Sequence, residues 1–417
     1  MRVLIVNTSE RTGGAAVAAN RLMEALIKNG VKAKMLVRDK QTDNPCVIAH
    51  PQQRRLRWAF LWERLTIWLR LGLRRKHLFD IDTGQCGADI TQLPEFQEAD
   101  VIHLHWVNQG MLSLKQINKI LDSGKHTVWT MHVIWPATAI CNLTLDCRQF
   151  EKECKACPLT PPSSLLSPLS SKIWKRKQRM LEGRKVTFVA CSEWLAGEAR
   201  QSALLKNQHV VSIPNPIDSG LYKPGDQQAA RKALGLPLDK KLILFASQRV
   251  TNEYKGMQYL MKSLTPTPSP MGKGNLGDDV ALMILGGHAE EVIEQLPLEA
   301  FPLGYVNDEH RIVEVYRAAD VFVLPSLSEN LPNTIMEAMA CGVPCVGFNV
   351  GGIPEEIKHK ETGYVAAYKD SEDLARGLHW VLREADRETL QKACRHHVME
   401  HYSQQSVAKR YLEIYEV

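Results

Sequence analysis

The chain has no uninterrupted apolar stretch long enough to span a bilayer, about 18 residues, so its sequence predicts no transmembrane helix. Its first residues enter an apolar strand pattern directly, without the layout of a cleavable signal, which favours a cytoplasmic protein. Ten cysteines among 417 residues do not make a dense disulfide framework, and most thiols are expected to be reduced. The net charge of +6 comes without a zinc-finger, helix-turn-helix or RNA-binding signature, so nucleic acid is not an expected partner.

The length of the chain and its alternation of apolar strands with helices predict two α/β domains. Each is expected to be a Rossmann-like domain with a doubly wound parallel sheet. The predicted domains cover residues 1–217 and 218–400, and a C-terminal helix over 401–417 is expected to pack back on the first. The proline-bearing segment 210–218 is predicted to be an extended connector, and the Pro/Gly-rich segment 265–279 a surface loop. Strands are expected at 3–6, 32–37, 100–105, 127–131, 186–190, 241–246, 281–285, 321–324 and 344–348.

The basic charge is concentrated in residues 54–76, which hold eight basic side chains and the single acid Glu63. Apolar residues at positions 58, 61, 62, 65, 68 and 69 follow helical spacing, with Arg57, Arg64 and Arg75 on another line of the same helix. Such a helix can lie on an anionic membrane surface. The alternative is a surface helix that packs its apolar stripe on its own domain.

The most informative stretch is 326–337, which places the carboxylates Glu329 and Glu337 across a strand-to-helix turn. An apolar strand precedes it, and Pro332 and Asn333 mark the start of a helix. Open α/β sheets bind ligands at the carboxyl ends of their strands. The two acids are therefore expected to face one ligand with hydroxyls at two places, such as a sugar joined to a ribose.

Two cations follow the first strand of the second domain. Arg249 can form paired hydrogen bonds with a diphosphate, and Lys255 can add a second positive charge. Near a leaving diphosphate, both would stabilise the negative charge that grows as a glycosidic bond breaks. The alternative is two solvated loop cations.

Three weaker signals also follow predicted strands. The Gly13-Gly14 turn lies at the start of a predicted helix. It can bind an anion through its backbone amides, or it can be a turn that packing requires. His132 can hydrogen-bond a substrate hydroxyl or serve a structural purpose. The turn at Tyr305 and Val306 can present backbone groups to a nucleotide base.

Four cysteines lie within the segment 141–157: Cys141, Cys147, Cys154 and Cys157. Their spacing allows a closed structural zinc site. Two disulfides or four separate thiols are the other interpretations.

Together these motifs resemble the retaining glycosyltransferases of family 4, which have the GT-B fold. The resemblance is carried by the Glu-x7-Glu element and its continuation over 338–344, by Arg249 with Lys255-Gly256, by the Gly13-Gly14 loop, and by Val350-Gly-Gly-Ile-Pro-Glu355. It implies two Rossmann-like domains that face each other across a cleft. The cysteine-rich stretch is similar to one in the subgroup that builds bacterial surface polysaccharides, of colanic acid or capsule type.

The resemblance also implies a role for each candidate residue. Glu329 and His132 would contact the donor sugar, and Glu337 the ribose hydroxyls. Arg249 and Lys255 would clamp the diphosphate. The remaining donor-binding positions would be Gly13, Gly14, Tyr305, Val306 and Asn333.

The function implied is transfer of a hexose, with retention, from a nucleotide-diphosphate sugar to a glycan or lipid-linked glycan acceptor. No cofactor is required for catalysis, and the expected location is cytoplasmic, peripheral on the inner face of the cytoplasmic membrane. Two alternatives are a sugar-nucleotide epimerase of the same architecture and a non-catalytic nucleotide-sugar-binding protein.

Overall fold

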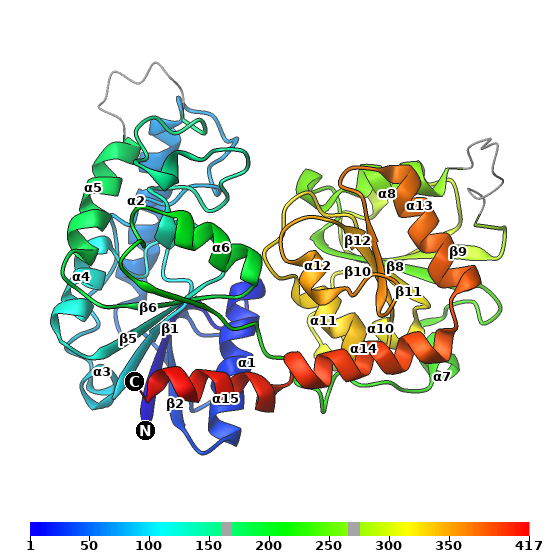
Figure 1. Ribbon diagram of the computed structural model, residues 1–417, viewed down its shortest axis with the longest axis horizontal. Helices are drawn as coiled ribbons and strands as arrows, with labels where there is room; N and C mark the ends of the chain where they lie inside the picture. Colours follow the sequence, from blue (N-terminus) through cyan, green and yellow to red (C-terminus); the bar gives the residue numbers. More distant parts are fainter. Residues whose placement is uncertain (161–168, 266–275, 417) are drawn as a thin grey trace. The chain divides into compact units, whose positions relative to one another are not determined.

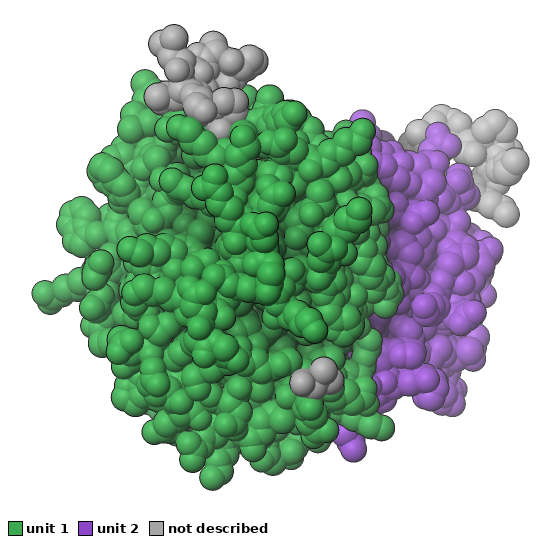
Figure 2. All heavy atoms as spheres, turned by 60° about the vertical axis from the view of Figure 1, so that its left-hand side comes forward, with its two compact units in different colours: residues 1–216, 407–417 green, residues 217–406 purple. Residues whose placement is uncertain are grey.

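A computed structural model describes residues 1–160, 169–265 and 276–416, so most of the loop expected over 265–279 lies outside the described residues. The chain forms two compact units, coloured separately in Figure 2. Unit 1 comprises residues 1–216 and the C-terminal residues from 407 onward, and unit 2 comprises residues 217–406. Each unit is built around one sheet, and all strand pairs of both sheets are parallel (Figure 1).

The sheet of unit 1 has seven strands in the order β3-β2-β1-β4-β5-β6-β7. Side chains alternate across it: Val3 and Ile5 of β1 lie in one apolar cluster, and Leu4 and Val6 lie in another. Both faces of the sheet are therefore buried, which explains the continuous apolar runs of its strands. The strands are β1 (Arg2–Ser9), β2 (Lys32–Asp39), β3 (Val47–Ala49), β4 (Val101–Leu104), β5 (His126–Met131), β6 (Thr187–Ala190) and β7 (His209–Ser212).

Helices cover both faces of this sheet. They are α1 (Gly14–Lys28), α2 (Gln53–Arg70), α3 (Pro94–Glu98), α4 (Leu114–Asp122), α5 (Leu169–Leu181), α6 (Glu193–Gln201) and the C-terminal α15 (Gln404–Tyr415). Short 3-10 turns lie at Trp135–Ala137 and Gln149–Glu151. Helix α15 is held against the sheet by two buried hydrogen bonds, Tyr411 Oη to Thr130 Oγ1 at 2.9 Å and Tyr415 Oη to His103 Nδ1 at 2.6 Å.

The sheet of unit 2 has six strands in the order β10-β9-β8-β11-β12-β13. They are β8 (Lys241–Arg249), β9 (Val280–Gly287), β10 (Ala300–Gly304), β11 (Val321–Leu324), β12 (Cys345–Phe348) and β13 (Gly363–Ala366). The helices are α7 (Gln227–Leu234), α8 (Met257–Leu264), α9 (Glu290–Ile293), α10 (Glu309–Ala318), α11 (Asn333–Ala340), α12 (Ile353–Glu356), α13 (Ser371–His379) and α14 (Arg387–His401). A 3-10 turn, η3 (Glu253–Lys255), precedes α8, and a π turn, Trp380–Glu384, follows α13.

The predicted fold class is confirmed: both units are doubly wound parallel α/β structures. The connector predicted over 210–218 is partly wrong, because His209–Ser212 form β7 at the edge of the first sheet. The short edge strands β3, β10 and β13 were also not predicted, since a few residues on a sheet edge carry little periodic signal.

Two expectations for residues 54–76 are corrected. Helix α2 ends at Arg70, so Arg75 lies beyond it and does not share a line with Arg64, which is buried. The apolar stripe does not pack on its own domain, because Trp58 and Trp62 are 73% and 63% exposed. No helix in the described ranges combines the length and apolarity needed to cross a bilayer.

Candidate functional site

The switch point of the unit 2 sheet lies between the neighbouring strands β8 and β11. The chain continues from β8 outward to β9 and β10 on one side, and from β11 to β12 and β13 on the other. Loops that leave the carboxyl ends of two such strands diverge and leave room for a ligand. Of the cations predicted from the sequence, Arg249 is the last residue of β8 and Lys255 follows that strand, and the two glutamates follow β11.

Two of the predicted residues are in direct contact. The ammonium of Lys255, in η3, forms an ion pair with Oε1 of Glu329, in the loop after β11. Ser326 Oγ donates a hydrogen bond to the same carboxylate oxygen at 2.9 Å. The Lys255 and Glu329 side chains are 31% and 13% exposed, so water and a ligand can still reach the pair.

Glycines bring the backbones of these loops together. Gly256 has φ 71°, and a Cβ at this position would lie 1.8 Å from the carbonyl oxygen of Pro325. Gly351 has φ 58°, and its Cβ would lie 1.7 Å from the carbonyl oxygen of Glu329. Both the positive φ and the close approach require glycine, and they set the position of the Glu329 loop against its neighbours.

Glu337 is held separately from Glu329. It lies in the second turn of α11, which begins at Asn333 as predicted, and only 9% of it is exposed. Tyr316 Oη donates a hydrogen bond to Glu337 Oε2 at 2.8 Å. Burial and the negative charge of Glu337 raise the pKa of Tyr316 well above its ordinary value, so the phenol keeps its proton and remains a donor.

A cavity of about 520 Å³ opens at the same edge of the sheet. This volume is within the range of small-molecule sites. Three predicted residues, Arg249, Lys255 and Tyr305, line it together with Ser247, Gln248, Asn252, Gly287 and His288. Glu329 joins this group through its ion pair with Lys255, whereas Val306 lies beside Tyr305 in the turn after β10.

Arg249 presents an exposed guanidinium to this cavity. Its Nε donates to Thr251 Oγ1 at 3.0 Å, which orients the planar group. With Lys255 it supplies two fixed positive charges at one cavity, a suitable arrangement for a diphosphate.

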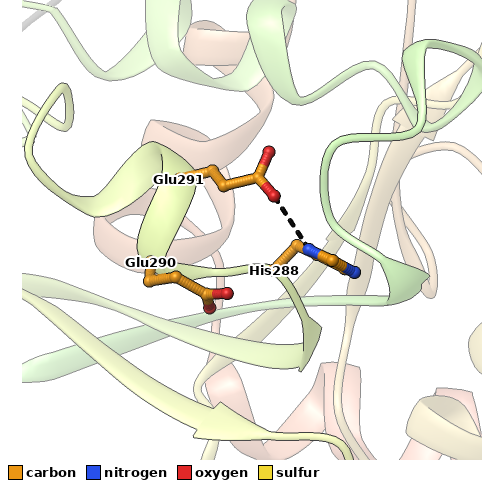
Figure 3. A group of neighbouring side chains, drawn as sticks. All are labelled: His288, Glu290 and Glu291. Carbon is orange, nitrogen blue, oxygen red and sulfur yellow. Dashed lines mark hydrogen bonds and ion pairs between the residues drawn. The ribbon is translucent and has the colours of Figure 1, made fainter.

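His288 was not selected from the sequence, although it directly follows the Gly286-Gly287 turn at the end of β9. Its Nδ1 lies 2.8 Å from Glu291 Oε1, and Glu290 is close by (Figure 3). Across the described residues, these three form the only group of three or more His, Cys, Asp or Glu side chains whose ligand atoms all lie within 4.8 Å of one another. All three are exposed.

In unit 1, His132 follows β5 as predicted and belongs to a polar chain. Its Nε2 lies 3.0 Å from His105 Nδ1, and its Nδ1 lies 3.5 Å from Cys191 Sγ. Burial lowers the pKa of His132 to about 4, so the imidazole is neutral at pH 7 and can exchange a hydrogen bond without carrying charge. His103 and His105 are buried as well.

The Gly13-Gly14 turn opens α1 as expected. Gly13 has φ 90°, and its carbonyl oxygen accepts hydrogen bonds from the amides of Ala16 and Val17. A Cβ on Gly13 would meet no atom within 4 Å, so packing does not require glycine there, although its backbone conformation favours one.

The four cysteines are free thiols; Cys141 and Cys154 belong to the core of unit 1, and Cys157 packs against it. Burial raises the pKa of Cys154 and of Cys157 to about 12, and the neighbouring cysteines add to the effect. No three of the four sulfurs, all of which are described, meet the 4.8 Å separation reached by His288 and its neighbours. A zinc ion would have to draw them together and displace their protons, so the zinc site stays a prediction that metal analysis of the purified protein would check.

Comparison with known proteins agrees with this architecture. Residues 12–221 match the family Glycosyltransferase Family 4, and residues 226–397 match Glycosyl transferases group 1. The chain is 32% identical over 219 residues to a D-inositol 3-phosphate glycosyltransferase of Saccharomonospora viridis, covering 49% of each chain. It is 26% identical over 217 residues to an N-acetyl-alpha-D-glucosaminyl L-malate synthase of Bacillus anthracis, covering 50% of this chain and 54% of the relative. The matches thus span about half the length of these curated relatives.

Solved structures share the fold over nearly the whole chain. A sucrose-phosphate synthase of Thermosynechococcus elongatus superposes with a TM-score of 0.65 at 18% identity, over 100% of this chain and 98% of the other. The Anabaena protein Alr3699/HepE in complex with UDP-glucose superposes with a TM-score of 0.64 at 15% identity, over 99% of this chain and 98% of the other. Since one family match covers half of the sequence, the chain belongs to glycosyltransferase family 4.

Proposed function

We propose that this protein is a retaining glycosyltransferase that moves a hexose from a nucleotide-diphosphate sugar to a glycan acceptor. The observation that carries the proposal is the cavity at the carboxyl ends of β8, β9 and β10, where Arg249 and Lys255 face one space and Glu329, in the loop after β11, is paired with Lys255. A diphosphate fits the two cations, and a carboxylate beside them fits a sugar hydroxyl. UDP-glucose bound to the structurally similar Anabaena protein is consistent with a donor of this class.

The ion pair suggests how the donor would bind, by exchange of one partner of Lys255 for another. In the structure Lys255 and Glu329 neutralise each other. A diphosphate that enters the cavity competes for the ammonium and frees the carboxylate to accept a hydrogen bond from the donor sugar. Glu337, held by Tyr316, is proposed to accept from the ribose hydroxyls, and Tyr305 and Val306 to border the base.

In the proposed reaction, the bond from the anomeric carbon to the diphosphate oxygen breaks, and its electron pair leaves with the diphosphate. The acceptor hydroxyl oxygen bonds to the same face of that carbon, and its proton passes to the departing phosphate. Arg249 and Lys255 stabilise the charge that develops on the leaving group. His132, neutral at pH 7, is proposed to hydrogen-bond a hydroxyl of the donor sugar.

A lipid-linked glycan of bacterial surface polysaccharide synthesis is the proposed acceptor. The subgroup resemblance of the cysteine-rich segment and the exposed basic helix α2 support this choice. The proposed location is cytoplasmic, peripheral on the inner face of the cytoplasmic membrane.

The test begins with a thermal-shift screen of UDP-, GDP- and other nucleotide sugars, followed by transfer assays with the donor that binds. Arg249→Ala and Glu329→Ala are expected to abolish transfer while keeping the wild-type circular dichroism spectrum. Lys392→Ala, an exposed cation on α14, is the control and should remain active. Full transfer by both site variants would refute this site. NMR showing conversion of the donor sugar without an acceptor would instead indicate an epimerase.

A further inference from the structure

In a water-soluble domain, a surface helix normally buries its apolar side chains and exposes its charged ones. Helix α2 does the reverse at several positions: two charged side chains face the domain, and tryptophans and leucines face outward. The face that packs against unit 1 includes the charged residues Glu63 and Arg64, only 1% and 7% exposed. The opposite face carries a row of exposed apolar side chains. These are Trp58 (73% exposed), Leu61 (53%), Trp62 (63%), Leu65 (42%) and Leu69 (58%).

The buried charges have specific partners that fix the rotation of the helix. Glu63 Oε1 accepts hydrogen bonds from Thr83 N at 3.0 Å, Thr83 Oγ1 at 2.7 Å and Gly84 N at 2.9 Å. Arg64 forms a buried ion pair with Asp82 and donates to the carbonyl oxygen of Leu78 at 2.7 Å. Turning the tryptophans inward would break these bonds and leave charges without partners, which is costly.

The backbone of α2 is also held in place. A Cβ on Gly110 would lie 2.6 Å from the amide nitrogen of Phe60, so the loop after β4 touches the middle of the helix. Leu56 and Ile67 are fully buried on the same inner side. The outward position of the apolar row is therefore a stable property of unit 1.

Cations surround the exposed row. Six exposed basic side chains flank it in sequence: Arg54, Arg55 and Arg57 in the first turns of α2, and Arg74, Arg75 and Lys76 just beyond its end. In the described part of the chain no carboxylate forms an ion pair with any of them, and the only acid of the segment, Glu63, is buried. The outer face thus combines bulky apolar side chains with uncompensated positive charge.

We propose that the outer face of α2 is a docking surface for an anionic lipid bilayer. Tryptophans and leucines would enter the boundary between headgroups and acyl chains, and the arginines would pair with lipid phosphates. Charge decides between this occupant and a second copy of the chain, because a two-fold contact would place twelve like charges together. This inference deepens the proposed function, because it names the surface on which the protein would meet a lipid-linked acceptor. Only this link to the acceptor rests on the proposed function; the binding of a bilayer by α2 does not.

The test is co-sedimentation of the full-length protein with vesicles, without any sugar substrate, so its result is independent of the glycosyltransferase assignment. Vesicles of phosphatidylcholine are compared with vesicles that also contain phosphatidylglycerol. Wild-type protein is expected to partition onto the anionic vesicles and to be released by high salt, because salt screens the arginine contribution. Binding to both vesicle types alike, or to neither, would overturn the proposal.

Variants separate the apolar and the charged contributions. Trp58→Ser with Trp62→Ser should lose most of the binding, and brominated acyl chains should quench the fluorescence of wild type but much less that of this variant. Arg54→Gln with Arg57→Gln should weaken partitioning roughly fivefold for each arginine removed. The matched controls are Trp194→Ser on α6, and Lys32→Gln with Lys34→Gln on β2, which should bind as wild type does.

All four altered sets are at surface positions, so unchanged melting temperatures would show that folding is intact. Equal vesicle binding by wild type and Trp58→Ser/Trp62→Ser would overturn the proposal. The proposal would also be overturned if the wild-type protein does not bind vesicles but forms a concentration-dependent dimer in light scattering, and if Trp58→Ser/Trp62→Ser abolishes that dimer.

Discussion

The ammonium of Lys255 and the carboxylate of Glu329 form an ion pair across two loops that are 74 positions apart in the sequence. If Lys255 serves the diphosphate and Glu329 the sugar, their removal has different effects. Lys255→Met should weaken binding of the free nucleoside diphosphate and of the nucleotide sugar alike, by about tenfold to a hundredfold, the contribution of a charge-assisted hydrogen bond.

Glu329→Gln should not weaken binding of the free nucleoside diphosphate, because the substitution removes a negative charge next to the cations. It should weaken binding of the nucleotide sugar only. Calorimetric titration of each variant with both ligands measures the difference. An equal loss for the two ligands in Glu329→Gln would contradict the separate roles.

The buried hydrogen bond from Tyr316 to Glu337 is expected to matter for stability and for ribose recognition. Tyr316→Phe removes a donor to a carboxylate that is only 9% exposed, which should cost about 1–3 kcal/mol in the free energy of unfolding. Urea denaturation checks this value. The same variant should bind the ribonucleotide less tightly than wild type, whereas a 2′-deoxyribonucleotide should show a smaller change. Unaltered stability would show that the bond contributes little.

The glycine at position 351 is expected to tolerate no side chain. In Gly351→Ala, the new Cβ would collide with the carbonyl oxygen of Glu329 and occupy a residue with φ 58°. Gly304→Ala is the matched control, because it has φ 68° but no atom within 4 Å of its Cβ. In the control, the free energy of unfolding should fall only by the cost of an alanine in a left-handed conformation, about 1 kcal/mol. In Gly351→Ala it should fall clearly further, and donor binding should be lost as well. Thermal melting of the two proteins side by side decides the question, and equal melting temperatures would be the contrary result.

Stability should decline with rising pH because of Glu356. This side chain is fully buried, and neither carboxylate oxygen has a hydrogen-bond partner among the described residues. Burial, followed by the negative charges of Glu329, Glu355 and Glu337, raises its pKa well above the ordinary 4.5. The folded state then holds a proton that the unfolded state releases, so this contribution to stability is complete below about pH 4.5 and is lost as pH rises toward the folded pKa.

Glu356→Gln keeps the shape and removes the titration. Its melting temperature should therefore fall less than that of wild type between mildly acidic and mildly alkaline pH. Glu361→Gln, an exposed acid of the same segment, should follow wild type. Parallel curves for all three proteins would contradict the buried proton.

Local sequence patterns predicted the charged side chains at the strand ends, but not the residues that form hydrogen bonds with them. Arg249, Lys255, Glu329 and Glu337 could be selected because each follows an apolar strand, and a strand end is a local feature. Ser326 and Tyr316, which hold the two glutamates, could not be selected, since a serine or tyrosine at a helix or strand end has no distinguishing spacing. His288 was missed for the same reason, although it directly follows two glycines at the end of β9.

Strand and helix periods are local and strong, so they were enough to predict two parallel α/β sheets and the loops that carry the charged residues. The tertiary structure was needed to make β8 and β11 neighbours, and hence to bring Lys255 to Glu329. It also decided which side of α2 faces outward, because the partners of Glu63 and Arg64 lie at residues 78–84, beyond the helix itself. Such pairings depend on contacts between distant segments, and no period within one segment encodes them.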